Sequence, residues 1–241
     1  MSVATASFPL ATAQPEERVD YLKKVLIWTS GGLVLSGASG LLTAGILYAA
    51  AAMGLNFVFN QWVMLAFIFG SYGVAQFVAP KMVFGQAKVI GFGVGAFFQG
   101  ISMGYLLLAA ISMGIQDGNP FGLVGAALIL TSMTGMGMTA YVWTGPKDFS
   151  MIGGLLSAVF VPMLVLMAVS FIFPALFGGV LGTIMCAVFV VISAAGLLYQ
   201  INQVMHQLRT DMHIEGAYLI TMGVLILFWN ILSLLMRLNR R

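Results

Sequence analysis

The stretch LIWTSGGLVLSGASGLLTAGILYAAAAM, residues 26–53, contains no charged residue and no proline. A helix needs about 20 predominantly apolar residues to cross the ~30 Å hydrocarbon core of a bilayer. Only helices and closed barrels satisfy the backbone there, and a continuous apolar run differs from the alternating pattern of a barrel strand. The stretch therefore predicts a transmembrane helix that is long enough to be tilted.

The composition of the whole chain is as apolar as a membrane protein requires. Of its 241 residues, 61% are hydrophobic and only 7% are charged, and the mean hydropathy is +1.03. A soluble domain carries roughly 25% charged residues, so lipid must be the solvent for most of this chain. The ten Lys and Arg residues lie beside apolar runs and not on one soluble face, which argues against nucleic acid as a partner. The single cysteine, Cys186, excludes a disulfide framework.

Polar and Pro/Gly breaks divide the chain into seven apolar segments. We predict an all-α integral membrane protein, a bundle of seven transmembrane helices. Residues 1–24 are expected to form an N-terminal cytosolic tail and juxtamembrane segment, and residues 25–241 a single transmembrane domain. Pro80 is expected to end the second span and Pro162 to kink the fifth. The expected spans are 26–53, 62–78, 89–113, 121–143, 151–173, 178–198 and 217–236.

The basic residues predict the orientation, because cytoplasmic loops carry an excess of Lys and Arg. With the N-terminus inside, the inner segments hold seven of the ten and the outer loops none: Arg18, Lys23, Lys24, Lys81, Lys88, Lys147 and Arg209 are inside. Seven spans would place Arg237, Arg240 and Arg241 outside, against the rule. Either the first spans dominate orientation, or the last segment is re-entrant. We expect seven spans with the N-terminus in the cytoplasm. The simple loops and the lack of a secretory-signal pattern favour a bacterial inner membrane.

Small residues recur one helical turn apart, a spacing that lets helix backbones approach closely in lipid. We expect them to serve packing within one bundle before any dimer contact. The pairs with G-x-x-x-G spacing are Gly91 and Gly95, Gly100 and Gly104, and Gly178 and Gly182.

Ionisable residues are scarce in the expected spans, and all seven acids fall in the tail or in connections. A proton relay or carboxylate ion site in the bilayer therefore lacks its residues. No catalytic motif, metal-ligand cluster or cofactor-binding motif is present. Uncharged polar residues remain at depth, as structural hydrogen-bonding groups or as a polar pathway: Gln76, Gln99, Gln200, Asn202 and Asn230.

Several short motifs resemble a known family. They are Lys147-Asp148-Phe149-Ser150 with Gly153-Gly154, Gly196-Leu197-Leu198-Tyr199, Glu215-Gly216-Ala217, and Ile231-Leu232-Ser233-Leu234-Leu235-Met236-Arg237, with a weaker match at Phe97-Phe98-Gln99-Gly100. From about residue 20 onward the chain resembles the Bax-inhibitor-motif family of multi-pass membrane proteins. The resemblance implies a seven-helix bundle with the last helix at its centre.

The resemblance also implies where function would lie. Family members are associated with a proton-sensitive calcium leak that depends on two aspartates, and in bacteria with modulation of a membrane-bound protease. At the matching positions this chain has Gln200 and Gly223, which do not titrate. We therefore expect the scaffold without the pH gate, acting as a non-enzymatic accessory subunit bound to other integral membrane proteins. The alternative is a leak for calcium or another cation through polar residues such as Gln99, Gln200 and Asn202.

Overall fold

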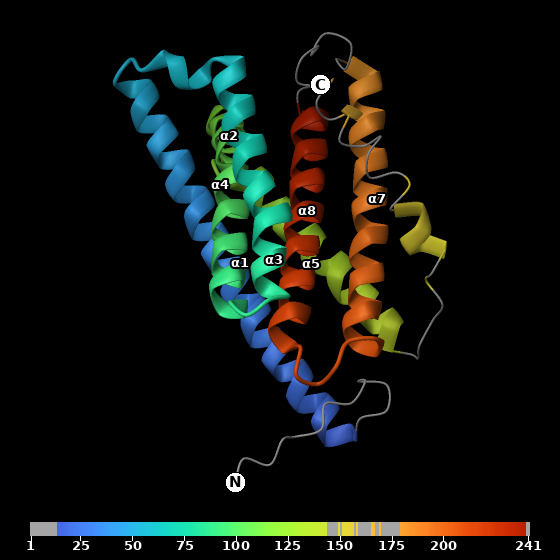
Figure 1. Cartoon of the computed structure of the whole chain (residues 1–241). Coiled ribbons are helices and arrows are strands. Elements are labelled where there is room, and N and C mark those ends of the chain that lie inside the picture. The colour runs from blue at the N-terminus through green and yellow to red at the C-terminus, as the bar shows by residue number, and fades with distance from the viewer. Residues whose placement is uncertain are drawn as a thin grey trace.

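The computed structural model describes residues 14–143, 149, 151–156, 158, 165–166, 169 and 179–239. Within them, six helical segments are long and apolar enough to cross a membrane, which confirms an all-α integral membrane protein. The described elements (Figure 1) are α1 (Pro15–Ala52), the 3-10 helix η2 (Asn56–Phe59), α2 (Gln61–Gly73), the π-helix η3 (Val74–Val78), α3 (Ala79–Val83), α4 (Lys88–Gln116), α5 (Gly122–Trp143), α7 (Gly179–His206) and α8 (His213–Asn239).

Two expected boundaries are wrong. The second span does not end at Pro80, because α2, η3 and α3 form one helical segment from Gln61 to Val83. The wider turn of the π-helix accommodates a proline whose ring would clash in an unbroken α-helix. The sixth span does not end at residue 198 but continues to His206, so that Gln200 and Asn202 lie well inside α7. The fifth span lies mostly outside the described residues, as do Pro162 and Gly178, although residues 151–156 are helical.

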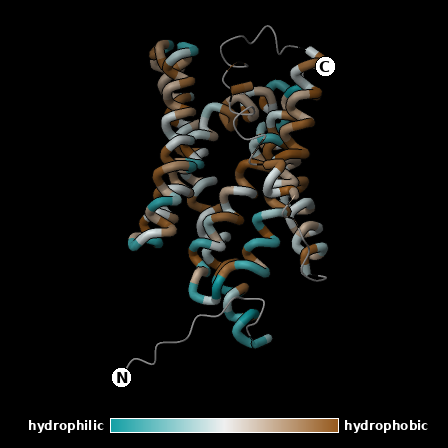
Figure 2. Tube along the Cα trace, turned by 45° about the vertical axis from the view of Figure 1, so that its right-hand side comes forward, coloured by the Kyte–Doolittle hydropathy of each residue, from teal (hydrophilic) through white to brown (hydrophobic). Residues whose placement is uncertain are grey.

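α1 begins at Pro15, where the sequence suggests a juxtamembrane helix, and continues without a break into the first span. The Glu17 carboxylate accepts a hydrogen bond from the backbone N–H of Gln14 at 3.4 Å, and Glu16 and Glu17 complement the positive end of the helix dipole. Figure 2 shows hydrophilic residues gathered in these first turns. The expected boundary at residue 24 thus falls within one continuous helix.

α8 occupies the centre of the bundle (Figure 1). It contacts α1, α3, α4, α5 and α7. Of its most apolar stretch, 50% is buried inside the protein, compared with 17% for α5 and 17% for α7. α4 is equally enclosed, with 56% buried. The expected central position of the last helix is confirmed, and α4 shares it.

The two ends of α8 lie at opposite ends of the bundle. At its first turn, Glu215 pairs with Lys88 at the start of α4. At its last turn, the Asn239 amide donates a hydrogen bond to the Asp117 carboxylate, beyond the end of α4, at 2.6 Å. α8 therefore runs the length of α4 as one continuous helix, which excludes a re-entrant last segment. The cytoplasmic side of the bundle remains a prediction.

Candidate functional site

The polar groups that surround α8 begin with a backbone carbonyl in η3, the π-helix of the second span. In the π-helix, the Ala79 amide donates to the carbonyl of Val74, five residues back. If this five-residue spacing continued, the Ala75 carbonyl would accept a hydrogen bond from the N–H of residue 80. Pro80 has no N–H. The hydroxyl of Tyr218 on α8 donates to the Ala75 carbonyl instead. A buried side chain of the central helix thus supplies the donor that the proline removes.

Gly95 on α4 makes room for this contact. A Cβ atom at Gly95 would meet the Tyr218 ring at 2.5 Å. One helical turn further along α4, Gln99 is almost fully buried and its carbonyl oxygen accepts a hydrogen bond from the Gln76 amide at 3.1 Å. The same amide lies 4.0 Å from the Met222 sulfur on α8. Gln76 and Gln99 therefore join the second and third spans beside the central helix.

Gln200 and Gly223 face each other across the α7–α8 interface. A Cβ atom at Gly223 would overlap the Oε1 atom of Gln200, and it would lie 3.0 Å from the Leu197 side chain. The missing side chain at Gly223 thus leaves the space that the Gln200 side chain fills. Gln200 Oε1 is buried and receives no hydrogen bond within the described part of the chain. Such an acceptor costs about 1–3 kcal/mol of desolvation.

The other two amide residues singled out in the sequence have different surroundings. Asn202 is 2% exposed on α7. Asn230 donates from its side chain to the Ile226 carbonyl at 3.0 Å, within its own helix. The contacts given above join Gln99 to Gln76 on one side of α8, and they set Gln200 against Gly223 on another.

The glycines of α4 divide into two faces. Gly91 and Gly95 lie against α3 and Tyr218, and Gly100 and Gly104 lie against α1. A Cβ atom at Gly100 would overlap the Ser39 hydroxyl and the Ser36 carbonyl. These α1 serines also donate to α4 carbonyls: Ser36 to Ala96 at 2.7 Å and Ser39 to Phe97 at 3.0 Å. Gly182 is buried in α7, and Gly178 lies outside the described residues.

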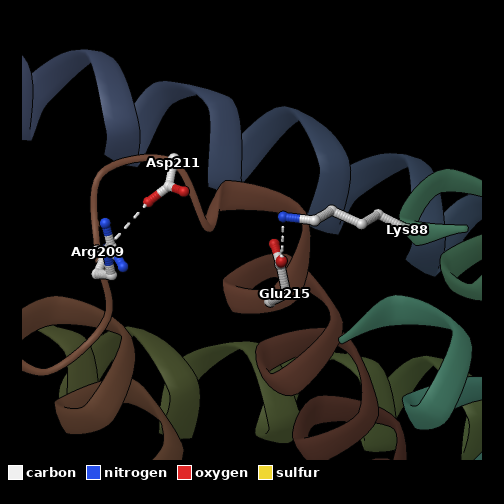
Figure 3. Close-up of polar contacts among 4 residues, drawn as sticks. All are labelled: Lys88, Arg209, Asp211 and Glu215. Carbon is white, nitrogen blue, oxygen red and sulfur yellow. Dashed lines mark ion pairs between the residues drawn. The ribbon is translucent and has the colours of Figure 1, made fainter. Parts of the chain in front are cut away.

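A buried ion pair at the start of α8 was missed in the sequence. Glu215 was expected in a connection, but it lies in the first turn of α8, only 2% exposed, with Oε1 2.6 Å from the Lys88 ammonium (Figure 3). The helix N-terminus also stabilises this carboxylate. Its Oε2 atom and the hydroxyl of the buried Tyr21 have no hydrogen-bond partner among the described residues. A Cβ atom at the adjacent Gly216 would meet that hydroxyl at 2.6 Å.

The nearby pair Arg209 and Asp211, in the turn between α7 and α8, differs in burial. Its atoms are 3.6 Å apart and both side chains are more than half exposed, so it contributes at most about 1 kcal/mol. Within the described ranges, the structure brings together no group of three or more His, Cys, Asp or Glu residues able to hold a metal ion. The site is therefore a set of amide, hydroxyl and carbonyl groups around α8, with one carboxylate, Glu215, paired with a lysine at its end.

Comparison with known proteins places this geometry in context. The chain matches the protein family described as inhibitor of apoptosis-promoting Bax1 over residues 18–241. It is 28% identical over 168 residues to the modulator of FtsH protease YccA of Escherichia coli, covering 69% of this chain and 71% of YccA. It is 33% identical over 116 residues to an uncharacterised protein of Pasteurella multocida, covering 47% of this chain and about half, 48%, of the relative. No solved structure matches it significantly.

Proposed function

Because the chain belongs to the family of inhibitors of apoptosis-promoting Bax1, we propose that it is a non-enzymatic accessory subunit that binds and regulates another integral membrane protein. The α7–α8 interface carries this proposal. There the Gln200 side chain fills the space beside Gly223, so the position that the resemblance assigns to an ion gate is a packing contact. A scaffold of this kind acts through the surface that it presents to its neighbours.

A membrane-bound protease is the partner that we propose. YccA, aligned over 71% of its length, is described as a modulator of FtsH protease. The surface that we assign to the partner is the outward face of α5, where Met133 is 66% exposed and Met136 is 73% exposed. Methionine adapts its shape readily and is frequent at binding surfaces that accept more than one geometry.

Placement in a bacterial inner membrane, with the start of α1 in the cytoplasm, belongs to the same proposal. YccA from a second Escherichia coli strain is described as an inner membrane protein. Lys81 and Lys88 lie at the same end of the bundle as the charged first turns of α1, which agrees with the preference of basic residues for the cytoplasmic side. Alkylation of single cysteines by an impermeant reagent, at the start of α1 and at the end of α8, tests this orientation.

The test of the function is site-specific crosslinking in native membranes. A photoreactive residue at Met133 is compared with one at Val191 on α7, which is a matched control because it is 68% exposed. We expect Met133 to yield a discrete adduct with a membrane protease and Val191 to yield much less. Migration of the mildly extracted protein alone, with no adduct from either position, contradicts the accessory role.

A cation leak is the second candidate, favoured by one observation. The buried Oε1 atom of Gln200 has no donor within the described residues, and such an oxygen can coordinate calcium or another cation in transit. Flux of calcium into liposomes that contain only this protein tests the idea. A leak requires flux that falls in the Gln200→Leu variant, and the accessory role predicts no flux from either protein.

A further inference from the structure

The connection between α1 and α2 exposes a dense group of large apolar side chains. Within residues 53–62 the exposed fractions are 76% for Met53, 45% for Leu55, 64% for Phe57, 37% for Phe59 and 66% for Trp62. No residue from 25 to 80 is charged, so nothing in the connection requires bulk water. The exposed polar side chains among them are the uncharged amides of Asn56, Asn60 and Gln61.

The connection has a defined fold. The backbone N–H of Leu55 donates to the Ala50 carbonyl at 2.9 Å, and the backbone N–H of Asn60 donates to the Phe57 carbonyl at 3.0 Å. The Asn60 side chain accepts from the Trp62 amide at 3.0 Å and so caps α2. Gly54 has a φ of 77°, which favours glycine at this bend. A backbone that satisfies itself in this way tolerates an environment poor in water.

One contact ties the connection to the bundle and fixes which side faces outward. The Tyr105 hydroxyl of α4 donates to the Val58 carbonyl at 2.7 Å, and the Tyr105 ring makes an edge contact with Phe59 at 6.4 Å between centroids. Val58 is only partly exposed and packs against the buried cluster of Leu47, Ile68 and Tyr105. Phe57 and Trp62 are left on the outer surface, and the last turns of α1 before the connection also expose apolar side chains, with Ile46 60% and Tyr48 65% exposed.

Helix lengths place this surface at a definite depth. Gln61 and Lys81 are separated by 20 residues of one helical segment, about 30 Å at 1.5 Å per residue. This equals the thickness of the hydrocarbon core. Lys81 is exposed and its ammonium marks one edge of that core, so Gln61 and Trp62 reach the other edge. Tryptophan concentrates at this level because its ring is apolar and its N–H is polar.

We infer that residues 53–62 form an interfacial anchor that lies in the lipid headgroup layer, on the side of the membrane opposite the start of α1, with Phe57 and Trp62 inserted among the upper acyl chains. Its partner is the phospholipid surface itself. The exposed apolar side chains at the end of α1, the absence of charge and the depth of Trp62 all favour lipid over a protein partner.

The experiment uses Trp62 as its own probe. Trp28, Trp143 and Trp229 are replaced by phenylalanine, and the protein is reconstituted alone into phosphatidylcholine vesicles with bromine at shallow or deep acyl positions. We expect a larger fractional loss of Trp62 emission with shallow bromine than with deep bromine, and little quenching by aqueous iodide. Quenching by iodide alone means that the connection lies in water, and protection from both quenchers means that a second copy covers it; either result overturns the inference.

A second measurement does not depend on the triple tryptophan variant. Spin labels are placed at Phe57→Cys or Val34→Cys in a Cys186→Ala background. Val34 is the matched control because it is 72% exposed on α1, nearer to the middle of the span. We expect the label at residue 57 to show less collision with oxygen than the label at residue 34, and much less collision with an aqueous nickel chelate than a label in water. A label at residue 57 that meets the chelate freely contradicts the anchor.

Discussion

The hydroxyl of Tyr218 donates a hydrogen bond to the carbonyl of Ala75, across the contact between the central helix and the π-helix of the second span. This carbonyl lacks a helical donor because residue 80 is proline. A carbonyl that has no donor in its own helix therefore accepts a hydrogen bond from another helix, far along the chain. The contact couples the conformation of η3 to the position of α8.

Removing the Tyr218 hydroxyl should lower the free energy of unfolding. The Tyr218→Phe variant leaves the buried Ala75 carbonyl unsatisfied, at an expected cost of about 1–3 kcal/mol in the free energy of unfolding. In a Pro80→Ala background the new amide can bond within the helix, so the same change should cost much less. Thermal unfolding in detergent of the four proteins of this cycle provides the measurement. Equal losses in both backgrounds would show that Pro80 is not the reason for the contact.

A packed and an open position on α4 predict opposite effects for two glycine substitutions. At Gly100 a methyl group would overlap the Ser36 carbonyl, which is backbone and cannot move without separating α1 from α4. At Gly93 nothing lies within 4 Å, so alanine should stabilise the helix by up to about 1 kcal/mol. Gly100→Ala should thus lower the thermal midpoint of unfolding and Gly93→Ala raise it. A neutral Gly100→Ala variant would mean that α1 and α4 are packed less closely.

The buried carboxylate at the start of α8 depends on its lysine. The Lys88→Met variant leaves the charge of Glu215 buried without a counterion, which should cost roughly 3–5 kcal/mol. The double variant Lys88→Met with Glu215→Gln should recover most of the stability that Lys88→Met loses. Arg209→Ala in the exposed pair is the control and should change stability by less than about 1 kcal/mol. Chemical denaturation in mild detergent distinguishes these values, and a Lys88→Met variant as stable as the control contradicts the pairing.

Two aspartates at the facing positions should make the stability depend on pH. The Gly223→Asp variant alone clashes with the end of the Gln200 side chain, whereas the shorter Gln200→Asp side chain frees that space. Two adjacent carboxylates cannot both ionise in a low dielectric. The folded state then retains a proton that the unfolded state releases, so stability should be greatest in acid and fall as pH rises. A thermal midpoint of the double variant that does not change with pH shows that positions 200 and 223 are not in contact.

The membrane fold could be predicted from the sequence because the composition leaves no alternative. With 7% charged residues, the chain cannot cover a soluble surface, and its uncharged runs have the length of a bilayer. The error at Pro80 has a physical reason, since the π-helix directly before it widens the turn in which the proline ring would otherwise clash with a backbone carbonyl. The central position of α8 came from the family resemblance and not from its pattern, because its apolar runs resemble those of its neighbours.

The site was less accessible to sequence reasoning. Gln99 and Gln200 stood out as polar residues in apolar spans, but their partners depend on how the helices are rotated against each other. Glu215 was assigned to a connection because the polar run before it hides the start of α8. A proline inside an uncharged span was the available signal for the Ala75 carbonyl, since it implies a missing donor. Nothing in the sequence around Tyr218 indicated that its hydroxyl would be the donor to the Ala75 carbonyl.

α8 also follows the other described helices in the chain, so it is made after them. α1 and α4 can pack through their serines and glycines as soon as both have entered the membrane, but the place of α8 beside them stays empty until α8 has been made. Until then, the carbonyl of Ala75 lacks the Tyr218 hydroxyl and Lys88 lacks the Glu215 carboxylate. Every chain under synthesis therefore passes through a stage in which these polar contacts are unfinished, and loss of the 27 residues of α8 would hold it there.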